Sequence, residues 1–142
     1  MMMTLKITGA LMLVAALGGC AEAQLIGRAV SYAADATVPP TVGLVAANAF
    51  DGFKATVTDA EVDCTPHTTP IPTQLPAALC ASQASNIRIM SAAVKAGTPL
   101  RNAIEPTTAG AVPVSGSVYN KLESELAILQ TAISTFNAAK GA

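Results

Sequence analysis

The chain of 142 residues is 51 % hydrophobic, largely because 29 residues are alanine, while 12 % of residues are charged and the net charge is −1. This length suffices for one compact domain and is too short for two domains with separate cores. The near-neutral balance excludes a nucleic-acid binder, which needs a basic surface to offset phosphate charge, and so few charges also argue against an expanded, disordered chain.

The N-terminal residues predict an export signal. A short start that carries Lys6 precedes a run of eleven mostly apolar residues, 7–17. About 20 apolar residues are needed to cross a bilayer, so this run is too short for a transmembrane helix and has the length of the apolar centre of a secretory signal peptide. A buried N-terminal helix of a cytosolic protein is the alternative interpretation.

The motif Leu17-Gly18-Gly19-Cys20 follows the apolar run. It resembles the lipobox of bacterial lipoprotein precursors, in which an aliphatic residue and two small residues precede the acylated cysteine. The resemblance implies that residues 1–19 are a signal peptide, that Cys20 becomes the lipidated N-terminus, and that this lipid anchor holds the protein on a membrane. Because Ala21 rather than Asp follows the cysteine, the resemblance also implies that the anchor lies in the bacterial outer membrane and faces the periplasm.

A second cleavage site lies directly behind this motif. Ala21-Glu22-Ala23 matches the A-x-A pattern of ordinary signal peptidase, which would release a soluble periplasmic chain beginning at Gln24. Under either scheme Cys20 is no longer a free thiol, so Cys64 and Cys80 remain as a pair. Since the periplasm is oxidising, we predict a disulfide between them.

The segment between these two cysteines contains prolines that exclude a helix or a central strand. The prolines are Pro66, Pro70, Pro72 and Pro76. A metal site is the competing interpretation, since Cys64 and His67 have C-x-x-H spacing and Cys80 could supply a third ligand. A fourth ligand would have to be Asp63 or a distant carboxylate. The ligand count favours the disulfide, so we predict no metal, no cofactor and a solvated His67.

Residues 20–40 are expected to form the acylated N-terminus and a tether, and residues 41–142 a helical domain. Pro39-Pro40 ends the Ala-rich tether, because proline cannot continue a helix. Apolar residues then recur at three- and four-residue steps over 42–62. This spacing predicts a first helix that Thr41 caps and that runs into Cys64.

A second helix is expected after Cys80, with Ser82 or Ser85 as its cap. Gly97-Thr98-Pro99 interrupts its pattern, because Gly97 suits a helix C-terminus and Pro99 the first position of a new helix. Two short helices, or one helix kinked at Pro99, both agree with this spacing.

The last helix has the clearest pattern. Ser115 or Ser117 opens it, Gly141 stops it, and its apolar residues alternate three and four apart in a heptad seam. The seam consists of Tyr119, Leu122, Leu126, Leu129, Ile133 and Phe136. The sequence therefore predicts an all-α fold, a small antiparallel three-helix bundle after an N-terminal signal segment, with a Pro-rich disulfide-closed loop.

Catalytic chemistry is not indicated, and we predict that the protein is not an enzyme. The single histidine, His67, lies among prolines without a nucleophile motif. Two sets of carboxylates alternate with other residues, so they point to different faces of their helices and are interpreted as solvated charges. These sets are Asp59, Glu61 and Asp63, and Glu123 and Glu125.

The expected function is a non-catalytic, membrane-tethered helical lipoprotein of the bacterial cell envelope that acts through contacts with another envelope protein. One alternative is a soluble periplasmic protein, cleaved after Ala23, that binds a small apolar ligand between its helices. A third possibility follows from a resemblance of the lipobox and the prolines to phage lysis-type outer-membrane lipoproteins, which disrupt the envelope.

Overall fold

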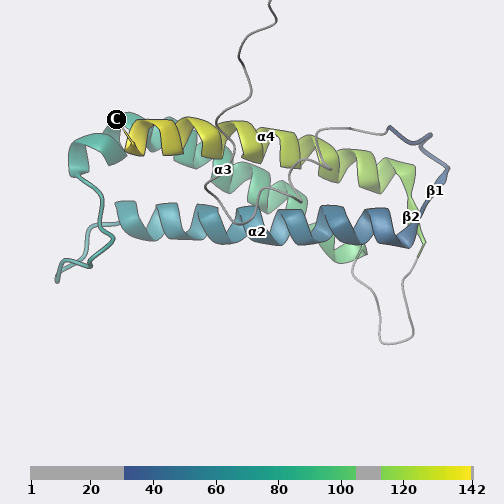
Figure 1. Cartoon of the computed structure of the whole chain (residues 1–142), viewed down its shortest axis with the longest axis horizontal. Coiled ribbons are helices and arrows are strands. Elements are labelled where there is room, and N and C mark those ends of the chain that lie inside the picture. The colour runs from purple at the N-terminus through teal and green to yellow at the C-terminus, as the bar shows by residue number, and fades with distance from the viewer. Residues whose placement is uncertain (1–30, 105–112, 142) are drawn as a thin grey trace, which may run out of the picture.

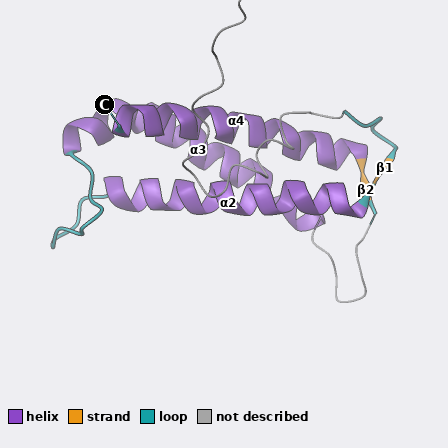
Figure 2. Ribbon diagram, viewed as in Figure 1, coloured by secondary structure: helices purple, strands orange, loops and turns teal. Residues whose placement is uncertain are grey.

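A computed structural model describes residues 31–104 and 113–141. It contains the helices α2 (Pro40–Cys64), α3 (Ala77–Ile104) and α4 (Gly116–Lys140) and the two-residue strands β1 (Thr37–Val38) and β2 (Val114–Ser115). Helix α3 runs antiparallel to α2 and α4, so the predicted antiparallel three-helix bundle is confirmed (Figure 1). Helices dominate the described chain (Figure 2), and the residues predicted to form the signal peptide, together with Cys20, lie outside it.

Helix α2 begins one residue before the predicted cap. Pro39 is the N-cap and Pro40 the first helical residue, so the expectation that Thr41 caps this helix is wrong. Proline is well suited to this position, because its fixed φ is helical and the first turn needs no N–H. The helix ends at Cys64, and Thr65 after it has an extended backbone. The prediction that the first helix runs into Cys64 is therefore confirmed.

Helix α3 is one continuous helix of 28 residues, which resolves the alternative left open at Pro99. It begins at Ala77, directly after the last loop proline, and not at Ser82 or Ser85. Gly97 does not cap a helix but lies buried within α3. Its lack of a side chain serves packing, since a Cβ there would overlap the ring of Phe50 on α2.

Helix α4 follows the prediction most closely. Ser115 is its N-cap, with the hydroxyl accepting a hydrogen bond of 3.4 Å from the Val118 N–H, and Gly141 is its C-cap. All six residues of the predicted seam are buried. Three leucines of the seam are completely inaccessible: Leu122, Leu126 and Leu129. All three helices contact one another, so this seam packs into a core that the whole bundle shares.

A short segment before α2 belongs to the domain, although the sequence places it in the tether of residues 20–40. Strand β1 pairs antiparallel with β2, opposing Thr37 to Ser115 and Val38 to Val114. Both valines are buried. The packed domain therefore extends N-terminally of residue 41, because the ladder and the buried valines fix the chain against the start of α4.

The side chain of Asn120 on α4 binds the same segment at a point further upstream, at Tyr32. Its Nδ2 donates to the Tyr32 carbonyl at 2.7 Å, and its Oδ1 accepts from the Tyr32 N–H at 3.2 Å. The Tyr32 ring packs edge-on against Tyr119, with centroids 5.3 Å apart. At Gly116 a Cβ would overlap the Ala33 carbonyl oxygen, so only glycine permits this close approach of the two segments.

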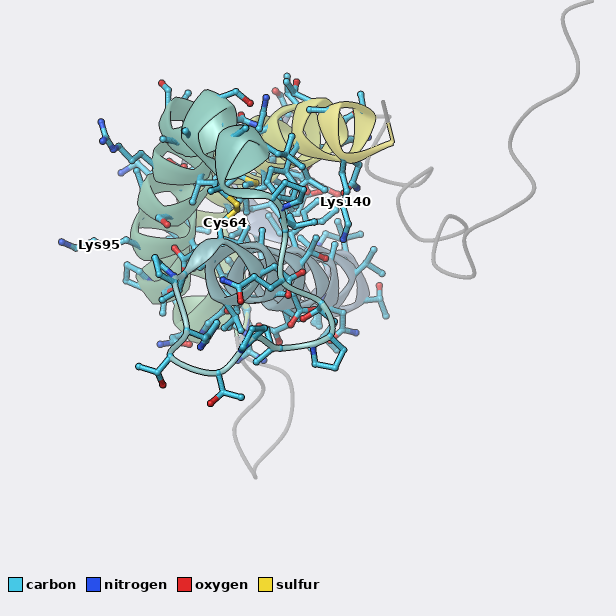
Figure 3. The ribbon with its side chains drawn as sticks, turned by 90° about the vertical axis from the view of Figure 1, so that its left-hand side faces the viewer. Cys64, Lys95 and Lys140 are labelled. Carbon is cyan, nitrogen blue, oxygen red and sulfur yellow. A yellow bond between two sulfur atoms is a disulfide. The ribbon has the colours of Figure 1, made fainter. Side chains whose placement is uncertain are left out.

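The Pro-rich loop connects α2 to α3 at the opposite end of the bundle from the strands (Figure 1). The predicted disulfide between Cys64 and Cys80 is present, with a Cα–Cα distance of 5.4 Å. Figure 3 looks onto this end, where the loop projects in front of the disulfide. The bond joins the end of α2 to the first turn of α3 and so closes the base of the loop.

Candidate functional site

The structure does not bring the predicted site residues together into one site. Cys20, the expected lipidation site, lies outside the described residues. Cys64 and Cys80 are bonded to each other, so neither sulfur is a free thiolate for a metal. His67 is exposed, as expected, and its Nε2 lies 3.0 Å from the Val62 carbonyl oxygen. In residues 31–104 and 113–141, no group of three or more His, Cys, Asp or Glu residues is placed to hold a metal ion.

An apolar groove lies between α3 and α4, with a volume of about 410 Å³. It is lined by Asn86, Ile89, Ala127, Ile128, Thr131, Ala132 and Thr135. Two isoleucines flank it with unusually large exposure, 48 % for Ile89 on α3 and 42 % for Ile128 on α4. We refer to this surface as the α3–α4 groove.

The side-chain hydrogen-bond donors in the α3–α4 groove are already paired within the protein. Asn86 Nδ2 donates to the Ala132 carbonyl at 2.8 Å and so links α3 to α4. The hydroxyls of Thr131 and Thr135 each donate at 3.0 Å to a carbonyl four residues earlier in α4. With these donors occupied and no charged residue in the lining, the groove offers an incoming group mainly apolar contact.

A second open hollow lies beside the disulfide. It is lined by Glu61, Cys64, Thr65, Cys80, Ala84, Ile87 and Arg88. The Glu61 carboxylate accepts a hydrogen bond from the Ser91 hydroxyl on α3, which ties α2 to α3 here. Both hollows are open at the surface, whereas the space between the helices is filled by the core side chains, such as Phe50, Met90 and Leu126.

The carboxylates are not all solvated, contrary to the expectation from their alternating pattern. Asp63 is buried near the end of α2, with its carboxylate 4.0 Å from the Lys140 ammonium at the end of α4. The pattern does not reveal this contact because the interaction joins residues that are distant in sequence. Asp59 and Glu61 are exposed, as predicted.

Glu123 is also partly buried, beside Tyr119. Burial raises the pKa of Glu123, while a side-chain hydrogen bond with Tyr119 acts to lower it. Burial, followed by the nearby Glu123 charge, raises the pKa of the Tyr119 phenol far above its ordinary value. A phenol that stays protonated next to a carboxylate in the packed face of α4 is best explained as a structural pair, and neither residue lines the α3–α4 hollow or the hollow beside the disulfide.

One further pair joins α2 to α3. The Arg101 guanidinium binds the Asp51 carboxylate through two nitrogens, with Nε–Oδ1 at 2.9 Å and Nη2–Oδ2 at 2.5 Å. The two-pronged geometry fixes the relative position of the helices better than a single contact would. Sequence spacing does not indicate this pair, which links residues 50 apart.

No helix among the described residues combines the length and hydropathy required to cross a bilayer. Comparison of the chain with protein-family models, with curated proteins and with solved structures finds no match. The fold and the surface thus define a class of architecture, a small disulfide-bonded three-helix bundle with an open apolar groove.

Proposed function

We propose that the protein is a non-catalytic, lipid-anchored component of the bacterial cell envelope that binds another envelope protein through the α3–α4 groove. The groove is the observation that carries the proposal, because Ile89 and Ile128 leave apolar surface exposed that the bundle itself does not cover. The motif Leu17-Gly18-Gly19-Cys20 supports the anchor. The disulfide between Cys64 and Cys80 is in keeping with an oxidising compartment.

The lining of the groove indicates the chemistry of the partner. Its α4 side is a stripe of about two turns, from Ala127 to Thr135, and Ile89 faces it from α3. A short amphipathic helix of the partner would present apolar residues at a matching spacing. An uncharged lining gives no attraction to an acidic or basic segment, so we propose an apolar helical face as the occupant.

The anchor is tested by labelling cells with a clickable fatty acid. Wild-type protein is expected to incorporate the label, and Cys20→Ser is expected to lose it because the acylated sulfur is gone. Mass spectrometry of the mature N-terminus provides the second readout. An acylated Cys20 supports the proposal, whereas an unlabelled chain beginning at Gln24 contradicts the anchor and favours the soluble periplasmic alternative.

The groove is tested by photo-crosslinking in cells. A benzoylphenylalanine placed at position 128 is expected to give one discrete adduct with an envelope protein, and Ile89→Asp in the same chain is expected to abolish it. Lys54, exposed on α2 and outside the groove, is the matched control position. The same adducts from positions 54 and 128, or no adduct from position 128, would contradict binding at the groove.

A further inference from the structure

The loop between α2 and α3, residues 65–76, has an unusual composition. It contains four threonines and four prolines in twelve residues and no Asp, Glu, Lys or Arg. Segments that combine hydroxyl residues with proline are typical acceptors of O-linked sugars, because proline prevents regular structure while the hydroxyls stay accessible.

The backbone of the loop is exposed and weakly bonded. Residues 65–70 are all exposed, and no backbone–backbone hydrogen bond of the described chain involves residues 66–70. The disulfide holds the base of the loop closed, and the loop projects from the end of the bundle (Figure 3). A modifying enzyme could therefore bind this segment in an extended form without unfolding α2 or α3.

The threonine hydroxyls differ in availability. Thr65 donates its hydroxyl to the Glu61 carbonyl at 2.7 Å, which engages it with the last turn of α2. Within the described residues, the hydroxyls of Thr68, Thr69 and Thr73 have no hydrogen-bond partner, and all three residues are exposed. Helical threonines such as Thr131 instead donate to the carbonyl four residues earlier.

We propose that Thr68, Thr69 and Thr73 are acceptor sites for O-linked glycosylation after export. The donor is a lipid-linked glycosyl diphosphate, and a glycosyltransferase supplies the base. Threonine Oγ1 attacks the anomeric carbon, the bond from that carbon to the diphosphate oxygen breaks, and the hydroxyl proton passes to the transferase base. The proposal rests on the export that is part of the proposed function.

The position of the loop is consistent with this modification. The chain enters the bundle at the strand end, and the loop lies at the opposite end (Figure 1). A helix of 25 residues, such as α2, is about 37 Å long, so about this distance separates the loop from the strand end of the bundle. No residue of the loop lines the α3–α4 groove, so the proposed acceptors lie outside it.

The distribution of basic residues permits a direct test. Trypsin cleaves after Lys54 and Arg88, and no Lys or Arg lies between them, so one peptide, 55–88, contains the complete loop and both cysteines. Peptide 122–140 from the same digest contains Thr131 and Thr135 and is the internal control. With protein purified from the bacterium that produces it, we expect reduced peptide 55–88 to be heavier by whole hexose or N-acetylhexosamine units, and peptide 122–140 to be unmodified.

Variants then locate the acceptors. The triple substitution Thr68→Val, Thr69→Val, Thr73→Val is expected to remove the added mass completely, whereas Thr65→Val is expected to retain it. Because these side chains are exposed, the melting temperature of the triple variant should match that of the wild type after enzymatic deglycosylation, which shows that loss of mass is not caused by misfolding. An unmodified wild-type peptide 55–88, or added mass that persists in the triple variant, would overturn the proposal.

The same digest separates this outcome from failure of the proposed function. The N-terminal peptide ending at Arg28 reports whether the chain is processed and acylated at Cys20. An acylated N-terminus with an unmodified loop overturns glycosylation and leaves the anchored function standing. An unprocessed N-terminus, with Cys64 and Cys80 reduced, overturns the export on which both proposals depend.

Discussion

Gly97 shows how one residue sets the distance between two helices. It lies buried in α3, where a Cβ would overlap the Phe50 ring, and that ring is itself almost inaccessible. Close packing of α3 on α2 therefore depends on the missing side chain. The sequence alone suggests a helix end at the same glycine, since glycine is frequent there and the contact with Phe50 is not visible in the sequence.

We expect Gly97→Ala to lower the free energy of unfolding. Overpacking costs about 1–3 kcal/mol, which outweighs the gain of about 1 kcal/mol in helix propensity. Gly52→Ala is the matched control, because a Cβ added at Gly52 in α2 would have no neighbouring atom within 4 Å. This control should gain up to about 1 kcal/mol. Urea denaturation measures both, and equal gains in the two variants would contradict the role of Gly97.

Glu123 supplies a pH-dependent contribution to stability. Burial raises its pKa in the folded protein, so ionisation is less favourable there than in the unfolded chain. The contribution of Glu123 to the free energy of unfolding is therefore fully present at low pH, below the pKa of Glu123 in the unfolded chain. It is lost as pH rises through the pKa of Glu123 in the folded protein. Glu123→Gln cannot ionise, so the stability of this variant relative to wild type should increase as pH rises through that interval.

Chemical denaturation across acid to neutral pH measures this difference. Tyr119→Phe is the informative companion variant, because the hydrogen bond with Tyr119 lowers the pKa of Glu123. Removing that bond should move the Glu123 titration, followed by carbon NMR of its carboxyl group, to higher pH. A Glu123→Gln stability difference that does not change with pH would contradict the burial argument.

At the level of elements, α3 differs most from its sequence pattern. Pro99 lies inside the helix, where its ring crowds the Lys95 carbonyl and it has no N–H to donate to that oxygen. Local propensity favours a break there, and the structure continues the helix because residues beyond Pro99 are held by tertiary contacts. Arg101 pairs with Asp51, and Ile104 is buried in the core.

Pro99→Ala is expected to stabilise the protein. An internal proline costs a helix about 3 kcal/mol, and part of that gain is offset because alanine increases the entropy of the unfolded chain by about 0.4–1 kcal/mol. We expect a net rise of about 2 kcal/mol in the free energy of unfolding, measured with heat or urea. Pro72→Ala, in the loop, changes only the entropy of the unfolded chain, so this variant should be neutral or slightly destabilising. No gain for Pro99→Ala would show that the bundle requires the proline geometry.

At the level of the whole molecule, the disulfide connects the two helices at the loop end of the bundle. Closing a loop of about 15 residues restricts the unfolded chain by about 3 kcal/mol, and the loop prolines, which already stiffen that chain, reduce the gain. Neither cysteine belongs to the buried core, and Cys64 packs only against its edge. The bundle is therefore expected to remain folded without the disulfide, at lower stability.

Cys64→Ser with Cys80→Ser should lower the free energy of unfolding by about 2–3 kcal/mol while the helical circular dichroism signal is retained. Wild-type protein with reductant should reach the same stability, which controls for the serine substitutions. Loss of helical signal under reducing conditions would instead show that the bundle depends on the covalent link to fold.

From the sequence alone one can predict the helical class, the position of α4, the non-helical loop and the cysteine pairing. These features follow from information that is local or can be counted, namely heptad spacing, the missing N–H of proline and an even number of remaining thiols. The seam of α4 was predictable residue by residue because one face of a helix needs only a 3.5-residue repeat to become the core.

Three features emerge only when the chain folds: the strand pair, the continuity of α3 and the α3–α4 groove. Each depends on contacts between distant residues, such as Asn120 with Tyr32, 88 positions apart, or Asn86 with Ala132, 46 positions apart. Spacing within one helix does not reveal which apolar residues a neighbouring helix will cover. Ile89 and Ile128 therefore look like other apolar residues in the sequence, and only the packing of α3 on α4 leaves them exposed.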